Sequence, residues 1–374
     1  MPAQAILAFD QYPADPSVGF ELGWDHAHYN VVPPPAHLTA ADPLRHGWLA
    51  GRAAFGARTL RSSRQVRKWL QLRLNAWRRG RAFDSVGVTP RLLAQIEVAA
   101  CPITGEALTH ATGTPTDASV DRVNNDAGYA LGNLAVMSVR ANQAKAGYAW
   151  DDALAFVSQI ENGGLDAIDG LSAREWARLG VLMSFCTPLK HEEAACLPLL
   201  VVPPARLRVL NAVQALQVLL TLQFTRPGHA RRVAELAALV PAGEVRHAFL
   251  VFMHTLLARR IAAGRLGDSP AMRRAMEDAW SDDLVNRRWQ RLSLRLTEAD
   301  CERLLRLADK HGLVGPSARR LERSLATDGW ALETAGYAIS AAPLRTAPLH
   351  RGGSTAAPGR AGAAPAHETL SSPC

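Results

Sequence analysis

Carboxylate and amide side chains are concentrated in one stretch of the chain, from Ser119 to Lys145. This stretch predicts a short strand, a polar loop that contains glycine, a second short strand and a helix. Asp121 ends the first strand, Asn133 ends the loop, and Asn142 lies one to two turns into the helix. The second strand and the helix can fold back onto the first strand, which brings these oxygen ligands together. Such an arrangement is typical of a small nuclease site built around one divalent cation.

The segment from Cys101 to Lys145 resembles the HNH, or ββα-metal, endonucleases, and especially their phage and bacterial members. The motifs that carry the resemblance are Cys-Pro-x-Thr-Gly from Cys101, Asp-Arg-x-Asn-Asn from Asp121, and Gly-Tyr-x-x-Gly-Asn ending at Asn133. The resemblance covers about 45 of 374 residues, so it concerns a module and not the whole protein. It implies a ββα fold and hydrolysis of phosphodiester bonds in DNA with Mg²⁺ or Mn²⁺ as the cofactor.

The resemblance also implies a role for each motif residue. Asp121 matches the acidic residue before the family's catalytic histidine, Asn133 the middle asparagine, and Asn142 the final His/Asn position. Asp121 and Asn142 are then the ligands of the cation, which suits the preference of Mg²⁺ for oxygen. Asn133 is expected to hydrogen-bond the loop and fix the two strands against each other, because an amide both donates and accepts. Lys145 is expected to contact nucleic acid.

Position 122 departs from the family pattern, because Arg122 stands where relatives have the catalytic histidine. Arginine stays protonated and has no acceptor, so it cannot activate water. It can clamp the scissile phosphate and stabilise the charge of the transition state. The water would then be activated by the metal alone, by a substrate phosphate, or by Asp117, Asp126 or His110. Three hypotheses stay open: a metal-dependent endonuclease, a silent module that binds nucleic acid or a partner, and a structural protein that carries a relic motif.

Neither the cysteines nor the clustered histidines predict a further metal site. The cysteines are scattered without Cys-x-x-Cys spacing, whereas tetrahedral zinc needs four ligands, so we expect no structural zinc. The sequence Asp25-His26-Ala-His28 has the spacing of a metal-binding pair, but no further ligand follows at a suitable distance. A packed or hydrogen-bonded role is favoured for it.

A basic run with no acidic residue extends from Arg45 to Arg81 and contains eleven lysines and arginines. Its periodicity predicts an amphipathic helix from about Ser63 to Arg79. The residues expected to face inward are Val66, Trp69, Leu70, Leu74 and Trp77, and those expected to face outward are Arg64, Arg67, Lys68, Arg78 and Arg79. A solvated helix face is the simplest interpretation, but long basic runs tend to bind polyanions. We therefore expect contacts with nucleic-acid phosphates, which give affinity without reading sequence.

Charge and composition agree with a nucleic-acid partner. The chain has 42 Lys and Arg against 34 Asp and Glu, a net charge of +8, so we expect DNA as the partner, with RNA as the alternative. The irregular cysteines favour a reducing cytoplasm. The N-terminus lacks the features of a signal peptide, and the apolar stretch from Leu197 to Phe224 is interrupted by Pro203 and Pro204, so we expect no membrane span.

The expected fold is mainly α, with a small ββα HNH-like module. The predicted parts are an irregular arm over residues 1–50, a basic helical segment over 51–100, the module over 101–148, an all-helical domain over 150–335, and a disordered tail over 341–374. One helix is predicted to begin at Thr89, before the helical domain, and another at Ser172, running to about Phe185. Further helices are predicted over 205–223, 228–239, 244–263, 270–290 and 298–311. No pattern indicates a protein partner for this domain.

Overall fold

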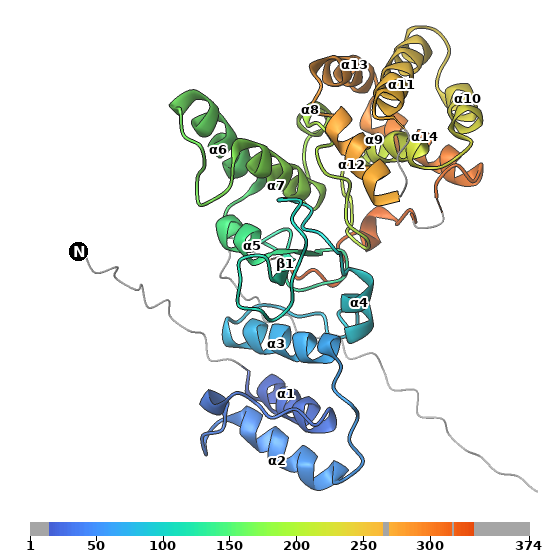
Figure 1. Cartoon of the computed structure of the whole chain (residues 1–374). Helices are drawn as coiled ribbons and strands as arrows, with labels where there is room; N and C mark the ends of the chain where they lie inside the picture. The colour runs from blue at the N-terminus through green and yellow to red at the C-terminus, as the bar shows by residue number, and fades with distance from the viewer. Residues whose placement is uncertain (1–14, 265–268, 316–317, 333–374) are drawn as a thin grey trace, which may run out of the picture. The chain divides into compact units, whose positions relative to one another are not determined.

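The protein is described by a computed structural model that covers residues 15–264, 269–315 and 318–332, all within one compact unit. These residues are mainly helical, with one small antiparallel sheet (Figure 1). The described helices are α1 (Pro16–His28), α2 (Pro43–Phe55), α3 (Arg64–Arg78), α4 (Pro90–Gln95), α5 (Val139–Lys145), α6 (Trp150–Gly163), α7 (Ala173–Phe185), α8 (His191–Cys196), α9 (Ala212–Leu222), α10 (His229–Leu239), α11 (Glu244–Ala262), α12 (Ser269–Ala279), α13 (Asp283–Ser293) and α14 (Glu298–Lys310), with short 3-10 turns at Pro35–His37, Gln223–Thr225 and Arg323–Leu325. Among the described residues, no helix is both long and apolar enough to cross a membrane.

The N-terminal segment forms two helices, so the prediction of an irregular arm over residues 1–50 is wrong for residues 15–50. Residues 1–14 lie outside the described residues. Pro16 and Pro43 occupy the first position of α1 and α2, where a missing N–H costs nothing. Asp15 caps α1 and Asp42 caps α2, each through a side chain that accepts a backbone N–H.

Glycines explain why α1 and α2 pack so closely. A Cβ atom at Gly23 would lie 1.9 Å from the carbonyl oxygen of Leu44, and one at Gly47 would lie 1.8 Å from that of Phe20. Each helix therefore brings its backbone directly against the other. Glycine, which usually weakens a helix, is required here because no side chain fits between the two backbones.

Helix α3 is confirmed where the sequence predicted it, with Ser63 as its N-cap. Val66, Trp69, Leu70 and Leu74 are buried, as expected, and Trp77 is half-buried. These residues join α4 in a core that also includes residues of the sheet. The predicted Thr89 cap of α4 is confirmed as well.

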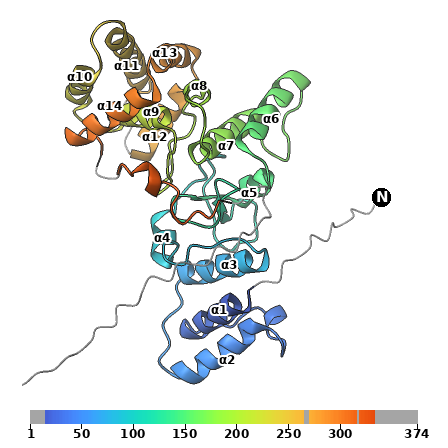
Figure 2. The same cartoon turned by 180° about the vertical axis from the view of Figure 1, so that it is seen from behind.

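The sheet has two strands, β1 (Ala118–Arg122) and β2 (Leu134–Ser138), and Asp121 pairs with Ala135. Side chains alternate along a strand, so β2 faces two different cores. Its alanine and methionine pack with α5 and the helical half, whereas Leu134 and Val136 pack with α3 and α4. In Figures 1 and 2, α5 and α3 lie on opposite sides of the sheet. We refer to β1, β2 and α5 together as the strand–helix unit.

The helical half follows the predicted spans closely. The predictions for 172–185, 228–239, 244–263 and 298–311 are confirmed to within two residues. The 205–223 helix begins only at residue 212, because the buried Asn211 amide donates to the Ser184 and Thr187 carbonyls and holds the preceding segment extended. The 270–290 span is two helices, since Asp282 caps a new helix after residue 279.

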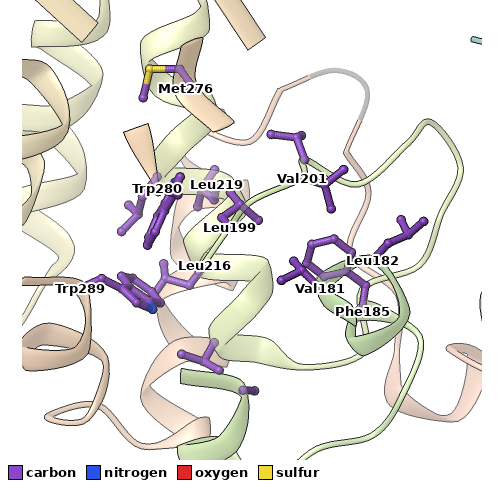
Figure 3. Close-up of a cluster of buried hydrophobic side chains, with 14 of the residues drawn as sticks. Val181, Leu182, Phe185, Leu199, Val201, Leu216, Leu219, Met276, Trp280 and Trp289 are labelled. Carbon is purple, nitrogen blue, oxygen red and sulfur yellow. The ribbon is translucent and has the colours of Figure 1, made fainter. Parts of the chain in front are cut away.

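The core of this half is built around two tryptophans. Trp280 and Trp289 are 0% and 1% exposed, and their rings meet edge to face at 5.8 Å. Figure 3 shows Trp289 near Leu216 and Trp280 near Leu199 and Leu219, while Val201 lies nearer Val181 and Leu182; all belong to the same buried cluster. The predicted disordered tail over 341–374 lies outside the described residues.

Candidate functional site

The strand–helix unit brings Asp121 and Asn142 to the same side of the sheet, where α5 lies. Ser119 and Asp121 share one face of β1, because they are two residues apart. The Asn142 amide nitrogen donates to the Ser119 hydroxyl at 2.7 Å. Asp121 and Asn142, the expected metal ligands, are thus on one face of the sheet. The Asn142 amide nitrogen, however, is hydrogen-bonded to Ser119 and not to Asp121.

Lys145 is the residue that contacts Asp121. Its Nζ lies 2.9 Å from Asp121 Oδ2, and it donates to the Arg122 carbonyl oxygen at 2.8 Å and to Asn125 Oδ1 at 2.7 Å. The lysine is 1% exposed. The contact with Asp121 lacks hydrogen-bond geometry, so attraction between opposite charges holds it. The structure therefore does not place Lys145 on a surface that nucleic acid can reach.

This arrangement does not fit the divalent cation that the resemblance implies. A cation bound to Asp121 would lie next to the Lys145 ammonium, which has like charge and no acceptor. At an effective dielectric constant of about 20, a divalent ion about 4 Å from an ammonium is opposed by about 8 kcal/mol. Among the described residues, no group of three His, Cys, Asp or Glu side chains is arranged to hold a metal.

Arg122 points to the opposite face of β1. Its Nη1 donates to the carbonyl oxygens of Asn125 and Ala127, both at 3.0 Å, and its guanidinium lies 5.3 Å from the ring centre of Tyr129. These contacts tie the loop between the strands to β1. The side chains of Asp121 and Arg122, which are adjacent in sequence, therefore make contacts on opposite sides of the sheet.

Asn133 is 0% exposed and closes the loop between the strands. Its Oδ1 accepts the Asn124 N–H at 2.8 Å, and its Nδ2 donates to the carbonyl oxygens of Asn124 and Gly128, both at 3.0 Å. The hydrogen bonds expected from the sequence are therefore present. All three belong to the loop, so they give Asn133 a positioning role.

The alternative water activators are poorly placed for that role. Asp117 accepts hydrogen bonds from the Thr109 and Thr112 hydroxyls and from two backbone N–H groups. Desolvation opposes ionisation of this carboxyl, but the hydrogen bonds outweigh it and hold the pKa of Asp117 well below its usual range. Such a carboxylate is a weak base. Asp126 and His110 are exposed at the surface and do not contact Asp121.

Four of the five cations of α3 that were expected to face outward are exposed, and Lys68 is the exception. Arg67, Arg78 and Arg79 are exposed and form no ion pair within the described chain. Arg64 pairs with Glu97 at 2.5 Å. Lys68 is half-buried, and burial lowers the pKa of its ammonium while Asp117 opposes the shift.

Not every cation of the basic run faces outward. Arg73 is 8% exposed, stacks on the Trp69 ring at 4.6 Å and forms an ion pair with Asp25 of α1. That pairing joins α3 to the N-terminal helices. The neighbouring His26 is buried and hydrogen-bonded to the Leu22 carbonyl, which agrees with a packed role for this histidine.

Asn125 and the buried position of Lys145 were not foreseen from the sequence. The spacing offers one signal, because residues 142 and 145 lie three apart on a helix and share a face. Comparison with known protein families, with curated proteins and with solved structures gave no match. The resemblance to HNH endonucleases therefore stands on its motifs alone.

Proposed function

We propose that this protein binds nucleic acid through α3 and that its nuclease-like strand–helix unit does not cleave the bound strand. The observation that carries the proposal is the ion pair between Lys145 and Asp121, because it engages the carboxylate that a catalytic cation would need. Arg122 supports it, since its guanidinium is hydrogen-bonded to the loop backbone. DNA is the expected partner, and RNA is the alternative.

The nucleic-acid part of the proposal depends on the exposed cations of α3. Arg67, Arg78 and Arg79 lie in a run with no acidic residue and have no ion-pair partner among the described residues. Arg64 contributes less, because Glu97 neutralises it. Arginines of this kind bind backbone phosphates, so binding should depend strongly on salt and weakly on sequence.

The test measures binding of the full chain to labelled duplex DNA and to RNA of the same sequence, in EDTA, by fluorescence anisotropy at several salt concentrations. The variant Arg67→Glu/Arg78→Glu/Arg79→Glu should bind more weakly, with a salt slope smaller by about 3, since each phosphate contact contributes about 0.9. If a matched control variant lost as much affinity, binding would depend on net charge alone, and the assignment to α3 would be overturned. The control reverses three other exposed arginines without ion pairs in the described chain, Arg287, Arg291 and Arg306.

The proposal that the strand–helix unit does not cleave nucleic acid is tested separately, by an assay for nicking of supercoiled plasmid in Mg²⁺ and in Mn²⁺. We expect no nicking by the wild type or by Asp121→Asn, an isosteric change. Circular dichroism must show that this variant is folded, because it leaves the Lys145 ammonium without its counterion. Metal-dependent nicking that disappears in Asp121→Asn would reinstate the endonuclease hypothesis. Arg122→His should also give no nicking, because Lys145 still holds Asp121; a gain of nicking in that variant would contradict the proposal.

A further inference from the structure

Three oxygen atoms converge on the Lys145 ammonium from separate parts of the strand–helix unit. The Asp121 carboxylate and the Arg122 carbonyl come from the end of β1, and the Asn125 amide oxygen comes from the loop that follows. Their distances from Nζ are 2.9, 2.8 and 2.7 Å. The lysine side chain reaches this point from the last turn of α5.

The three oxygens have the character of a cation site. A carboxylate, an amide oxygen and a peptide carbonyl are the hard ligands that Ca²⁺, Mg²⁺ and Mn²⁺ prefer. The Asn125 amide is fixed in this orientation, because its nitrogen donates to the carbonyl oxygens of Ala146 and Tyr148 at 3.3 and 3.1 Å. These two hydrogen bonds should therefore keep the Asn125 amide oxygen pointing to the same position when the ammonium is removed.

We propose that Lys145 is the built-in cation of the strand–helix unit, and that its oxygen ligands form a divalent-cation site which opens when the ammonium is removed. This inference rests on the part of the proposed function that assigns Lys145 to Asp121, and is independent of nucleic-acid binding by α3. An ammonium can stay buried only when oxygens compensate its lost hydration. The same compensation is available to a metal ion.

Distances decide which ion the opened site should prefer. Ca²⁺ binds oxygen at about 2.3–2.6 Å and Mg²⁺ at about 2.0–2.1 Å. The oxygens around Lys145 Nζ lie at 2.7–2.9 Å, so they must contract less for Ca²⁺. With a single carboxylate the affinity should be weak, on the order of the millimolar constants of low-charge calcium sites.

The test uses the full chain with Lys145→Ala, and measures the melting temperature in EDTA and during titration with CaCl₂, with MgCl₂ for comparison. The wild-type melting temperature should not change with either ion. Lys145→Ala should melt lower in EDTA and recover as Ca²⁺ rises, with a smaller response to Mg²⁺. Asp121→Asn/Lys145→Ala should show no recovery. The inference is overturned if Lys145→Ala does not respond to Ca²⁺, or if the wild type is stabilised by Ca²⁺ through Asp121.

A second comparison keeps the inference testable if Lys145→Ala does not fold in EDTA. The double variant removes both charges, so in EDTA it should fold and melt at a higher temperature than Lys145→Ala. A double variant no more stable than Lys145→Ala would contradict the role of the ammonium as the counterion of Asp121. If only the double variant folds, Ca²⁺ should restore the helical circular dichroism of Lys145→Ala, and failure to do so overturns the inference.

Nucleic-acid binding by α3 and the built-in cation can fail separately. Salt-dependent binding in EDTA that is lost on charge reversal in α3 supports the proposed function whatever the Ca²⁺ titrations give. Conversely, a Ca²⁺-dependent recovery of Lys145→Ala supports the built-in cation even if the wild type binds neither DNA nor RNA. Metal-dependent nicking by the wild type would contradict both the built-in cation and the absence of cleavage, because it requires a cation at Asp121 while Lys145 is present.

Discussion

Replacement of Asn133 by alanine should destabilise the protein strongly, because this side chain satisfies three backbone groups of the loop between β1 and β2. The amide is 0% exposed, and its partners are the N–H and carbonyl of Asn124 and the carbonyl of Gly128. No other side chain in the described residues makes hydrogen bonds to these three groups. The Asn124 carbonyl also accepts the Ala127 N–H at 3.4 Å, so the change leaves one donor, the Asn124 N–H, and one acceptor, the Gly128 carbonyl, without a partner.

The size of the effect follows from the cost of unsatisfied groups. A buried donor or acceptor without a partner costs about 1–3 kcal/mol. Asn124 is only half-buried, so water can reach part of its backbone, and we expect a total loss of about 3 kcal/mol and not the maximum for two groups. For a chain of this length, such a loss lowers the melting temperature by about 4 °C.

Urea unfolding monitored by circular dichroism measures this loss directly. Asn75→Ala provides the control, since Asn75 is half-buried on α3 and its side chain makes no hydrogen bond within the described chain; we expect a change within about 0.5 kcal/mol. A loss below about 1 kcal/mol for Asn133→Ala, similar to that of the control, would refute the positioning role. At temperatures where both variants are folded, nucleic-acid affinity should be unchanged.

Three further predictions concern the elements around the site. Gly47→Ala should cost about 2 kcal/mol or more in urea unfolding, because its Cβ would meet a backbone carbonyl at 1.8 Å, whereas Gly147→Ala meets nothing within 4 Å and should change stability by less than about 0.5 kcal/mol. Arg73→Met should cost about 2 kcal/mol by the same measurement, below the full value for a buried pair because its partner Asp25 is 26% exposed. The folded-state pKa of Asp117 is lowered, so its contribution is complete above the unfolded pKa of about 4 and is lost as pH falls towards the folded pKa. The stability advantage of the wild type over Asp117→Asn should therefore be constant from pH 5 to 7 and shrink below pH 4, and an advantage that grows with acid would contradict the assignment.

Much of the fold could be predicted from the sequence, because the signals involved are local. The cap of α7 is one example: Ser172 and Glu175 exchange the expected hydrogen bonds. Thr297 and Asp300 do the same at the start of α14. Both signals span four residues, so they need no knowledge of distant contacts. The periodicity of α3 is equally local: four of the five residues expected to face inward are buried and Trp77 is half-buried. The burial of Leu72, Arg73 and Ala76 was not expected.

The N-terminal helices were missed although Asp15-Pro16 and Asp42-Pro43 are local start signals, because glycines inside both helices weaken the local helix signal. Gly47 suits a helix only when the backbone of α1 lies against it. The same limit applies to the candidate site. A lysine three residues after Asn142 could be assigned to the correct helix face, but its pairing with Asp121 and Asn125 depends on how tightly α5 packs on β1. Motif spacing carries no information on that distance.

Under the proposed function, one arginine and one lysine on opposite faces of β1 would make the nuclease-like motif stable without a bound cation. Arg122 ties the loop to the strand on one face, and Lys145 compensates Asp121 on the other. Both charges are covalently attached, so the fold should not depend on metal supply. Loss of Asp121 alone would leave the Lys145 ammonium buried without its counterion, a situation that costs several kcal/mol. The aspartate is therefore expected to be needed for stability even where it has no part in catalysis, and a motif of this kind is by itself weak evidence for activity.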